Sequence, residues 1–255
     1  MVQRRPVPLT AVEVDRLPGD CAGCLFWELA GPCPQPRSAT GLTGLAPSVP
    51  PHEAARDPRD RKRDWVSARV AEGTPPGAII EVAGPPTGAT RAPSGTAPRR
   101  EVMGMALFAP AEVYAPRSGA VPRISRDAVQ LATVWVPDVH RQAGVGRLLL
   151  QAALREAIRL DRPAVEAYGD RRFRPRGCVL PDRWLLHEGF EVHREHPRTP
   201  VLRLETRRTV RWAASLEQAW EQAWEQAREE VRSRLPVPSP ERGTVHGSGE
   251  PSAPS

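Results

Sequence analysis

Between Ala128 and Ile158 the sequence predicts a strand, a polar loop with glycines and an amphipathic helix in direct succession. The strand covers Asp127–Val136 (DAVQLATVWV), which is rich in valine and threonine. From Gly146 onward, apolar or small residues recur at the spacing of a helix that buries one face, at positions 149, 150, 153, 154, 157 and 158. Pro163 stops that helix, and Ala164–Tyr168 reads as the next strand. This strand–helix–strand unit indicates an α/β protein.

The loop that opens this helix has the composition of an anion-binding cradle. The first N–H groups of a helix have no partner inside the helix and carry partial positive charge. Gly144 and Gly146 let the backbone approach a phosphate without a Cβ in the way, and Arg141 and Arg147 add charge beside it. We therefore expect this loop to bind an anionic ligand.

Three phosphate-binding patterns can be compared with this loop. A P-loop requires GxxxxGK[ST], but Lys62 is the only lysine of the chain. A dinucleotide fingerprint requires GxGxxG, and the third glycine is missing after Gly144-Val145-Gly146. The pattern [R/Q]xxGx[G/A] is satisfied by Arg141–Gly146, and a strand that ends in Val136-Pro137 precedes it while LLL follows it.

The remaining patterned segments predict further strands and helices around this unit. Strands are expected at Val7–Val14, Gly77–Val82, Glu101–Phe108, Phe190–His193 and Val201–Leu204, helices at Arg59–Ala71 and Pro181–Glu188, and a strand or helix start at Cys24–Leu29. Residues 31–60 and 84–100 are dense in proline and glycine and are expected to be loop-like insertions, the second in a hairpin connection. A helix at 213–235, with Trp220 and Trp224 on one face, is expected to dock on the body or to mediate a homodimer or partner contact, before a disordered tail at 236–255.

Composition and charge limit the classes of protein to which the chain can belong. Hydrophobic residues make up 40% and charged residues 26%, and no run of about 18 apolar residues exists, which excludes a membrane-spanning helix. The N-terminus lacks an apolar signal segment, so a cytoplasmic protein is expected. The net charge of +6 rests almost entirely on arginine. We interpret this as codon bias of a GC-rich genome rather than a nucleic-acid interface, although it suits an anionic ligand.

Four cysteines allow more than one interpretation. Cys21 and Cys24 form a CxxC pair, which with Cys33 and Cys178 could make a zinc site or a redox pair. A second CxxC is missing, so we favour ordinary reduced thiols and expect no stoichiometric metal.

At the block LATVWVPDVHRQAGVGRLLLQAALREA, with Gly189-Phe190 as a second match, the chain resembles the GNAT superfamily of acyl-CoA-dependent N-acyltransferases, in a GC-rich bacterial form. The resemblance covers about residues 7–206 and implies one domain, at 1–212, with a mixed, mostly antiparallel sheet flanked by helices. It implies acetyl-CoA as acyl donor and direct attack by a primary amine of a small molecule or peptide. The backbone of Val134, Trp135 and Val136 would bind the pantetheine arm. Amides of Arg141, Gln142, Ala143, Gly144, Val145, Gly146 and Arg147 would hold the pyrophosphate.

The chain departs from the family pattern at both usual acid–base positions. The tyrosine that many members carry as general acid is replaced by Leu185, and the motif strand offers only Gln130 and Thr133 where many have a glutamate. The catalytic candidates are therefore Glu166, Tyr168 and His187. Asp170 and His193 are further candidates. The loop arginines 171, 172, 174 and 176 could contact an anionic substrate or the nucleotide.

Three functions follow as hypotheses. The first is N-acetyl transfer from acetyl-CoA to an amine. The second is a catalytically silent CoA-binding regulatory module, which the missing acid–base residues favour. The third is a basic scaffold for protein or nucleic acid, which the charge and the tryptophan helix would support.

Overall fold

The computed structural model describes residues 5–17, 19–30, 43–44, 56–83, 100–115, 117–118, 121–172, 178–208 and 225. The expected insertions at 31–60 and 84–100 lie largely outside these ranges. The expected C-terminal helix and tail also lie outside them, apart from Glu225.

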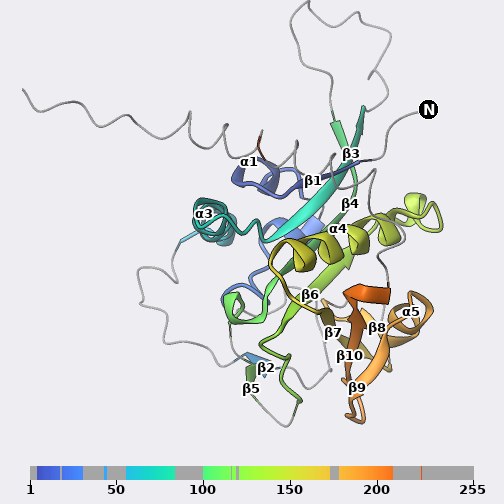
Figure 1. Cartoon of the computed structure of the whole chain (residues 1–255). Coiled ribbons are helices and arrows are strands. Elements are labelled where there is room, and N and C mark those ends of the chain that lie inside the picture. The colour runs from blue at the N-terminus through green and yellow to red at the C-terminus, as the bar shows by residue number, and fades with distance from the viewer. Residues whose placement is uncertain are drawn as a thin grey trace, which may run out of the picture.

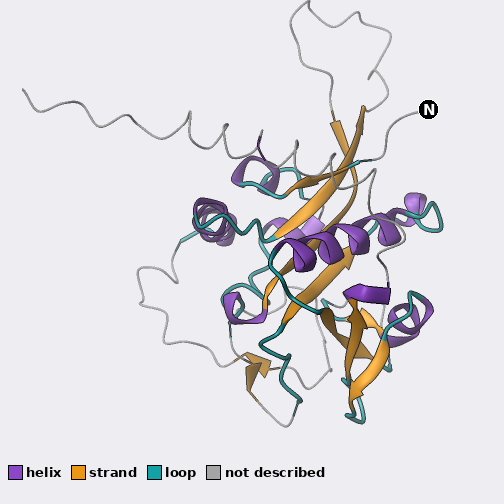
Figure 2. Cartoon of the chain, viewed as in Figure 1, coloured by secondary structure: helices purple, strands orange, loops and turns teal. Residues whose placement is uncertain are grey.

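One mixed sheet organises the described part of the chain (Figures 1 and 2). Its strand order is β1-β3-β4-β6-β7-β10-β9, with β8 beside β7. The strands are β1 Pro6–Pro8, β3 Gly77–Ala83, β4 Arg100–Pro110, β6 Ala128–Trp135, β7 Ala164–Asp170, β8 Leu180–Pro181, β9 Glu191–Arg194 and β10 Val201–Glu205. Only β6–β7 and β7–β8 pair in parallel among these strands. The predicted mixed, mostly antiparallel sheet is confirmed. A separate pair, β2 Thr43–Gly44 with β5 Arg117–Ser118, was not predicted.

Helices cover both faces of the sheet. α4, Val145–Arg159, lies across the strands (Figure 1), and its Leu149 and Ala153 pack against Phe108 and Leu131. α5, Asp182–His187, adds Leu185 to this same core. The opposite core joins Met105 and Leu107 of β4 to Trp27, to α1 (Ala11–Val14) and to α3 (Pro58–Ala71). Short 3-10 turns lie at Gly19–Ala22, Ala111–Val113, Asp138–His140 and Thr206–Arg208.

Three sequence-based expectations in the N-terminal region are corrected. The single strand expected at Val7–Val14 ends at Pro8, because Thr10 and Glu13 form a capping box that starts α1. Cys24–Leu29 forms turns rather than a strand or helix, with the Leu29 N–H donating to the Leu25 carbonyl at 3.0 Å. The insertion expected to reach residue 60 stops earlier, since Asp57 caps α3 and Pro58 occupies its first turn.

β6 and β7 pair along only part of β6, so the sheet opens between these two strands. β6 pairs with β7 only from Ala128 to Gln130, whereas it follows β4 as far as Trp135. The register with β4 shifts between Leu107 and Phe108, so Ala132 is an extra residue that bulges β6. Beyond Gln130, no described strand pairs with β6 on its β7 side.

Gly104 of β4 allows α4 to begin close to the sheet. A Cβ at this position would lie 2.8 Å from Val145 Cγ1 and 3.1 Å from the Trp135 carbonyl oxygen. Gly104→Val should therefore lower the free energy of unfolding by about 1–3 kcal/mol, because the first turn of α4 must move. Urea unfolding would measure this. Gly23→Val is the matched control, since the nearest atom to a Cβ there lies 3.8 Å away. Equal stability of the two variants would contradict the close packing.

Candidate active site

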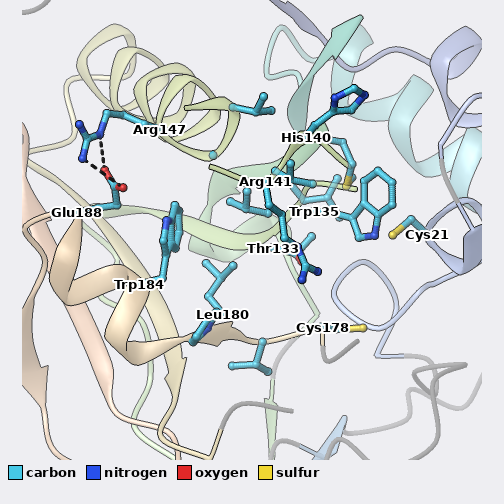
Figure 3. Close-up of a pocket in the computed structure, with 18 of the residues that line it drawn as sticks. Cys21, Thr133, Trp135, His140, Arg141, Arg147, Cys178, Leu180, Trp184 and Glu188 are labelled. Atoms are coloured by element: carbon cyan, nitrogen blue, oxygen red, sulfur yellow. Dashed lines mark hydrogen bonds and ion pairs between the residues drawn. The ribbon is translucent and has the colours of Figure 1, made fainter. Parts of the chain in front are cut away.

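A pocket of about 810 Å³ opens where β6 leaves β7 (Figure 3). Its lining comes from the end of β6, from the loop and first turn of α4, from β8 and α5, and from the segment around Cys21–Glu28. Figure 3 shows Arg147, Glu188 and Trp184 on one side of the pocket, and Cys21 and Cys178 on the other. The pocket thus joins the predicted anion cradle to the N-terminal region.

The cradle is formed by the backbone ahead of α4. Gln142 and Gly144 both have left-handed backbone angles, with φ of 65° and 77°. Gly144 is the N-cap residue, and a Cβ built on it would meet no atom within 4 Å, so this surface is open. The first bond of the helix runs from the Leu148 N–H to the Gly144 carbonyl at 3.1 Å. The N–H groups of the helix residues before Leu148 have no place in this bonding pattern and lie at the open N-terminus of α4. A helix N-terminus of this kind is an arrangement that binds anions.

The two arginines beside the cradle are paired with carboxylates. Arg147 Nε lies 2.8 Å from Glu188 Oε2, and this bond raises the pKa of the guanidinium. Arg141 Nη2 lies 2.9 Å from Asp138 Oδ1 in an exposed pair. Both guanidinium groups therefore already have a carboxylate partner beside the cradle.

The unpaired edge of β6 forms the adjacent wall. Val134, Trp135 and Val136 are half-buried and line the pocket. Val134 and Trp135 pair with β4 on the opposite side. An extended ligand with amide groups could hydrogen-bond to this edge as an added strand would. The structure brings all the predicted cofactor residues except Ala143 into the pocket lining.

Trp184 of α5 closes the cradle from the side and was not foreseen from the sequence. An ideal Cβ on Gly146 would lie 3.4 Å from Trp184 Cζ2, so the indole packs against the first turn of α4. The missed signal was a large aromatic residue in the short helix that follows the loop arginines. Gly146 therefore borders both the pocket and this ring.

Of the three catalytic candidates, only His187 lines the pocket. His187 is exposed at the end of α5. Tyr168 is 5% exposed and stacks on Trp27 with ring centroids 5.8 Å apart. It lies behind the pocket wall, because Trp27 itself belongs to the lining.

Glu166 lies in a separate ion-pair network. Its carboxylate is fully buried and accepts bonds from the Ser125 N–H at 2.8 Å, from Ser125 Oγ at 2.7 Å and from Arg203 Nη1 at 2.8 Å. His193 Nε2 lies 3.7 Å away, at a second, polar pocket. This geometry assigns Glu166 to holding β7, β10 and the Ser125 loop together.

Glu166→Gln should therefore destabilise the protein without removing pocket chemistry. The amide cannot accept from three donors as the carboxylate does, and it leaves Arg203 with less compensation, which we expect to cost about 1–3 kcal/mol. The exposed ion pair Arg69–Glu72 offers Glu72→Gln as a control with little effect. Thermal unfolding together with acyl-transfer rates would test this. A lost rate at unchanged stability would restore Glu166 as a catalytic residue.

Asp170 and Arg171, two further residues considered from the sequence, make their contacts outside the pocket. Asp170 accepts a bond from the Arg172 N–H at 2.9 Å. Arg171 Nη2 lies 2.6 Å from Glu195 Oε2. Neither Asp170 nor Arg171 belongs to the pocket lining. Arg174 and Arg176 lie outside the described residues.

A buried ion pair lines the inner side of the pocket and was not foreseen. Lys62 Nζ lies 2.6 Å from Glu28 Oε1 and donates to the Cys24 carbonyl at 2.8 Å, with both side chains at most 2% exposed. Burial lowers the pKa of Lys62, but the Glu28 carboxylate outweighs it, so the pKa is raised and the ammonium stays charged. The second carboxylate oxygen of Glu28 has no hydrogen-bond partner among the described residues.

Cys21, Cys24 and Cys178 are thiols at this same side of the pocket. Within the described ranges, no group of three or more histidine, cysteine or acidic residues could hold a metal ion. Cys33 lies outside those ranges. None of the described helices is long and apolar enough to cross a membrane.

No protein-family model matches the chain, and no curated protein matches it in sequence. Among solved structures, it is similar to the PaiA N-acetyltransferase of Thermoplasma acidophilum in complex with coenzyme A, at 10% identity and a TM-score of 0.43, over 80% of this chain and 99% of that one. It is similar to an acetyltransferase of Thermus thermophilus, at 14% identity and a TM-score of 0.36, over 80% and 99%. A third is the histone acetyltransferase HPA2 and related acetyltransferase of Corynebacterium glutamicum, at 17% identity and 0.37, over 81% and 96%.

Proposed function

We propose that this chain is a GNAT-type N-acyltransferase that moves the acetyl group of acetyl-CoA to a primary amine. One observation carries the proposal: an exposed helix N-terminus with a left-handed glycine cap and an unpaired strand edge open into the same pocket. The first suits a pyrophosphate, and the second suits a chain of amides. Coenzyme A carries a pyrophosphate and a chain of two amides in one molecule, so it could bind to both parts of the pocket.

The residues present fit acetyl-CoA. The pyrophosphate would lie against the N–H groups at Gly144–Gly146, where a Cβ on Gly144 would meet nothing and one on Gly146 would reach Trp184. The pantetheine amides would bond along Val134–Val136. The pocket of about 810 Å³ also extends to the side lined by Cys21, Glu28 and Cys178, where an acceptor could enter.

Bound acetyl-CoA would supply an activated thioester carbonyl. The protein would hold this carbonyl beside the β6 bulge, where an N–H near Val134 can stabilise negative charge on the carbonyl oxygen. The amine nitrogen would attack the carbonyl carbon and lose a proton, the carbon–sulfur bond would break, and the leaving thiolate would take up a proton. His187 lines the pocket and is the candidate side chain for proton transfer, alone or through water.

A silent CoA-binding module is the second candidate. It is favoured by the placement of Glu166 and Tyr168 outside the pocket lining, which leaves His187 as the single predicted catalytic residue that reaches it. The module would bind acetyl-CoA at the same cradle but would show no transfer to an amine.

Thiol release from acetyl-CoA in the presence of a panel of primary amines distinguishes the two. Faster release with at least one amine, accompanied by acetylated product in the mass spectrum, supports the transferase. Binding of acetyl-CoA without amine-dependent release supports the silent module. A folded protein that does not bind acetyl-CoA would overturn both.

A further inference from the structure

Two cysteines that are far apart in the sequence meet in the pocket wall. Cys24 Sγ and Cys178 Sγ lie 3.7 Å apart across a sequence separation of 154 residues. Both residues are half-buried and line the pocket, so small solutes that enter it can reach them. Figure 3 shows Cys178 on the side of the pocket away from Arg147 and Glu188.

Buried anchors hold both cysteine backbones in place. Lys62 Nζ donates to the carbonyl of Cys24 at 2.8 Å. Trp27 Nε1 donates to the carbonyl of Cys178 at 3.0 Å. Trp27 is 2% exposed and is packed between Phe26 and Tyr168. The two sulfurs are therefore neighbours because the fold positions their backbones, not because two surface loops happen to meet.

The buried ammonium of Lys62 also acts on the thiols. Burial lowers the pKa of Lys62, while Glu28 and then Cys24 and Cys21 raise it. The thiolate is the form of a cysteine that reacts with oxidants and disulfides, and the ammonium of Lys62, which also pairs with Glu28, lies close enough to interact with both of these thiols.

We propose that Cys24 and Cys178 form a reversible disulfide that joins the N-terminal segment to the β8 segment across the pocket wall. A peroxide is the chemical class of oxidant. With hydrogen peroxide, the thiolate of one cysteine attacks a peroxide oxygen, the O–O bond breaks, and the hydroxide that leaves takes up a proton, so that a sulfenic acid and one water result. The second thiol attacks that sulfur, the S–S bond forms and a second water leaves. Two thiols lose two electrons in total, and a dithiol reductant reverses the step.

Little movement is needed for this bond. An S–S bond of about 2.05 Å requires the sulfurs to approach by about 1.7 Å from their separation of 3.7 Å. The bridge would close a loop of more than a hundred residues. It should therefore raise the midpoint of thermal unfolding by roughly 5 °C or more.

The test uses the full chain, reduced and then treated with a small excess of hydrogen peroxide. Non-reducing peptide mapping should find the peptide with Cys24 linked to the peptide with Cys178, and dithiothreitol should release it. Cys24→Ser and Cys178→Ser should each abolish the link and the gain in thermal midpoint. Cys21→Ser and Cys33→Ser, with the same chemical change, should retain both.

The peptide map and the thermal midpoint do not depend on acyl-transfer activity, so they test the disulfide independently of the proposed function. Absence of the link in wild type, or a link to Cys178 that survives in Cys24→Ser, would overturn the assignment. Sulfinic acid at either cysteine in place of the bridge would do the same. Circular dichroism of the reduced serine variants confirms that they are folded before oxidation.

Discussion

Lys62→Met should lower the free energy of unfolding by about 3–5 kcal/mol, because it leaves the Glu28 carboxylate charged and buried without its partner. Glu28 Oε1 lies 2.6 Å from Lys62 Nζ, and the glutamate side chain is 1% exposed. The substitution also removes the donor to the Cys24 carbonyl. Methionine has a volume close to that of lysine, so a cavity contributes little to the loss. Urea unfolding followed by tryptophan fluorescence measures the effect.

Two further variants test whether the lost ion pair causes the loss of stability in Lys62→Met. Adding Glu28→Leu to Lys62→Met should recover most of the stability, since a buried ion pair can be replaced by apolar residues at little cost. Arg59→Met, an exposed position on the same helix, should unfold like wild type. A single Lys62→Met variant as stable as wild type would show that the pair does not hold the N-terminal region to α3.

The pair also predicts a direction for the pH dependence of stability. The pKa of Lys62 is raised from its ordinary value of 10.5. Its contribution is therefore complete below pH 10.5 and is lost as the pH rises through the higher folded-state value. The stability advantage of wild type over Lys62→Met should be constant near neutral pH and should shrink above pH 10.5. An advantage that shrinks already near neutral pH would contradict the ionised pair.

Gly146→Asp should weaken acetyl-CoA binding by about 1–3 kcal/mol or more, which is roughly 5- to 150-fold in dissociation constant. The new carboxylate would enter the first turn of α4, where the phosphates are proposed to lie, and its Cβ would lie 3.4 Å from Trp184 Cζ2. A carboxylate near a helix N-terminus does not oppose the helix dipole, so the fold should persist. Calorimetric titration, with circular dichroism of each variant, measures the loss.

Gly146→Asn separates charge from bulk, because it has the same shape without the carboxylate charge. Its loss of affinity should be clearly smaller than that of the aspartate. Arg141→Ala should also have a smaller effect, since that side chain is 58% exposed and pairs with Asp138. A folded Gly146→Asp variant with wild-type affinity would show that acetyl-CoA does not bind at the cradle.

Local patterns predicted the elements that build the site. The apolar spacing after Gly146 predicted α4, and the loop with Gly144 predicted the cradle, because both depend on neighbouring residues. The capping box at Thr10 and Glu13 is a local signal for a helix start, but the alternating residues around it are equally typical of a strand. The antiparallel pairing of β3 and β4 agrees with the expected hairpin connection.

Long-range contacts account for what the sequence could not predict. Lys62 meets Glu28, and Cys24 meets Cys178, only because the sheet brings distant segments together. Glu166 and Tyr168 are candidates by residue type alone, because the neighbours that each side chain meets depend on β10 and on Trp27. Trp184 is a visible aromatic residue in the sequence, but that its ring lies against Gly146 depends on where the fold places α5.

Hydrogen–deuterium exchange with and without acetyl-CoA tests the central claim, that one ligand occupies both the cradle and the strand edge. Saturating acetyl-CoA should slow exchange in peptides that cover residues 131–136 and 142–148, because the ligand would bond to N–H groups in each segment that face the pocket. Peptides from the polar pocket around Glu166 should be unchanged, since Glu166 lies outside the proposed site. Protection of both segments in wild type and its loss in Gly146→Asp is the predicted result. Unchanged exchange in both segments, or protection confined to another part of the chain, would contradict it.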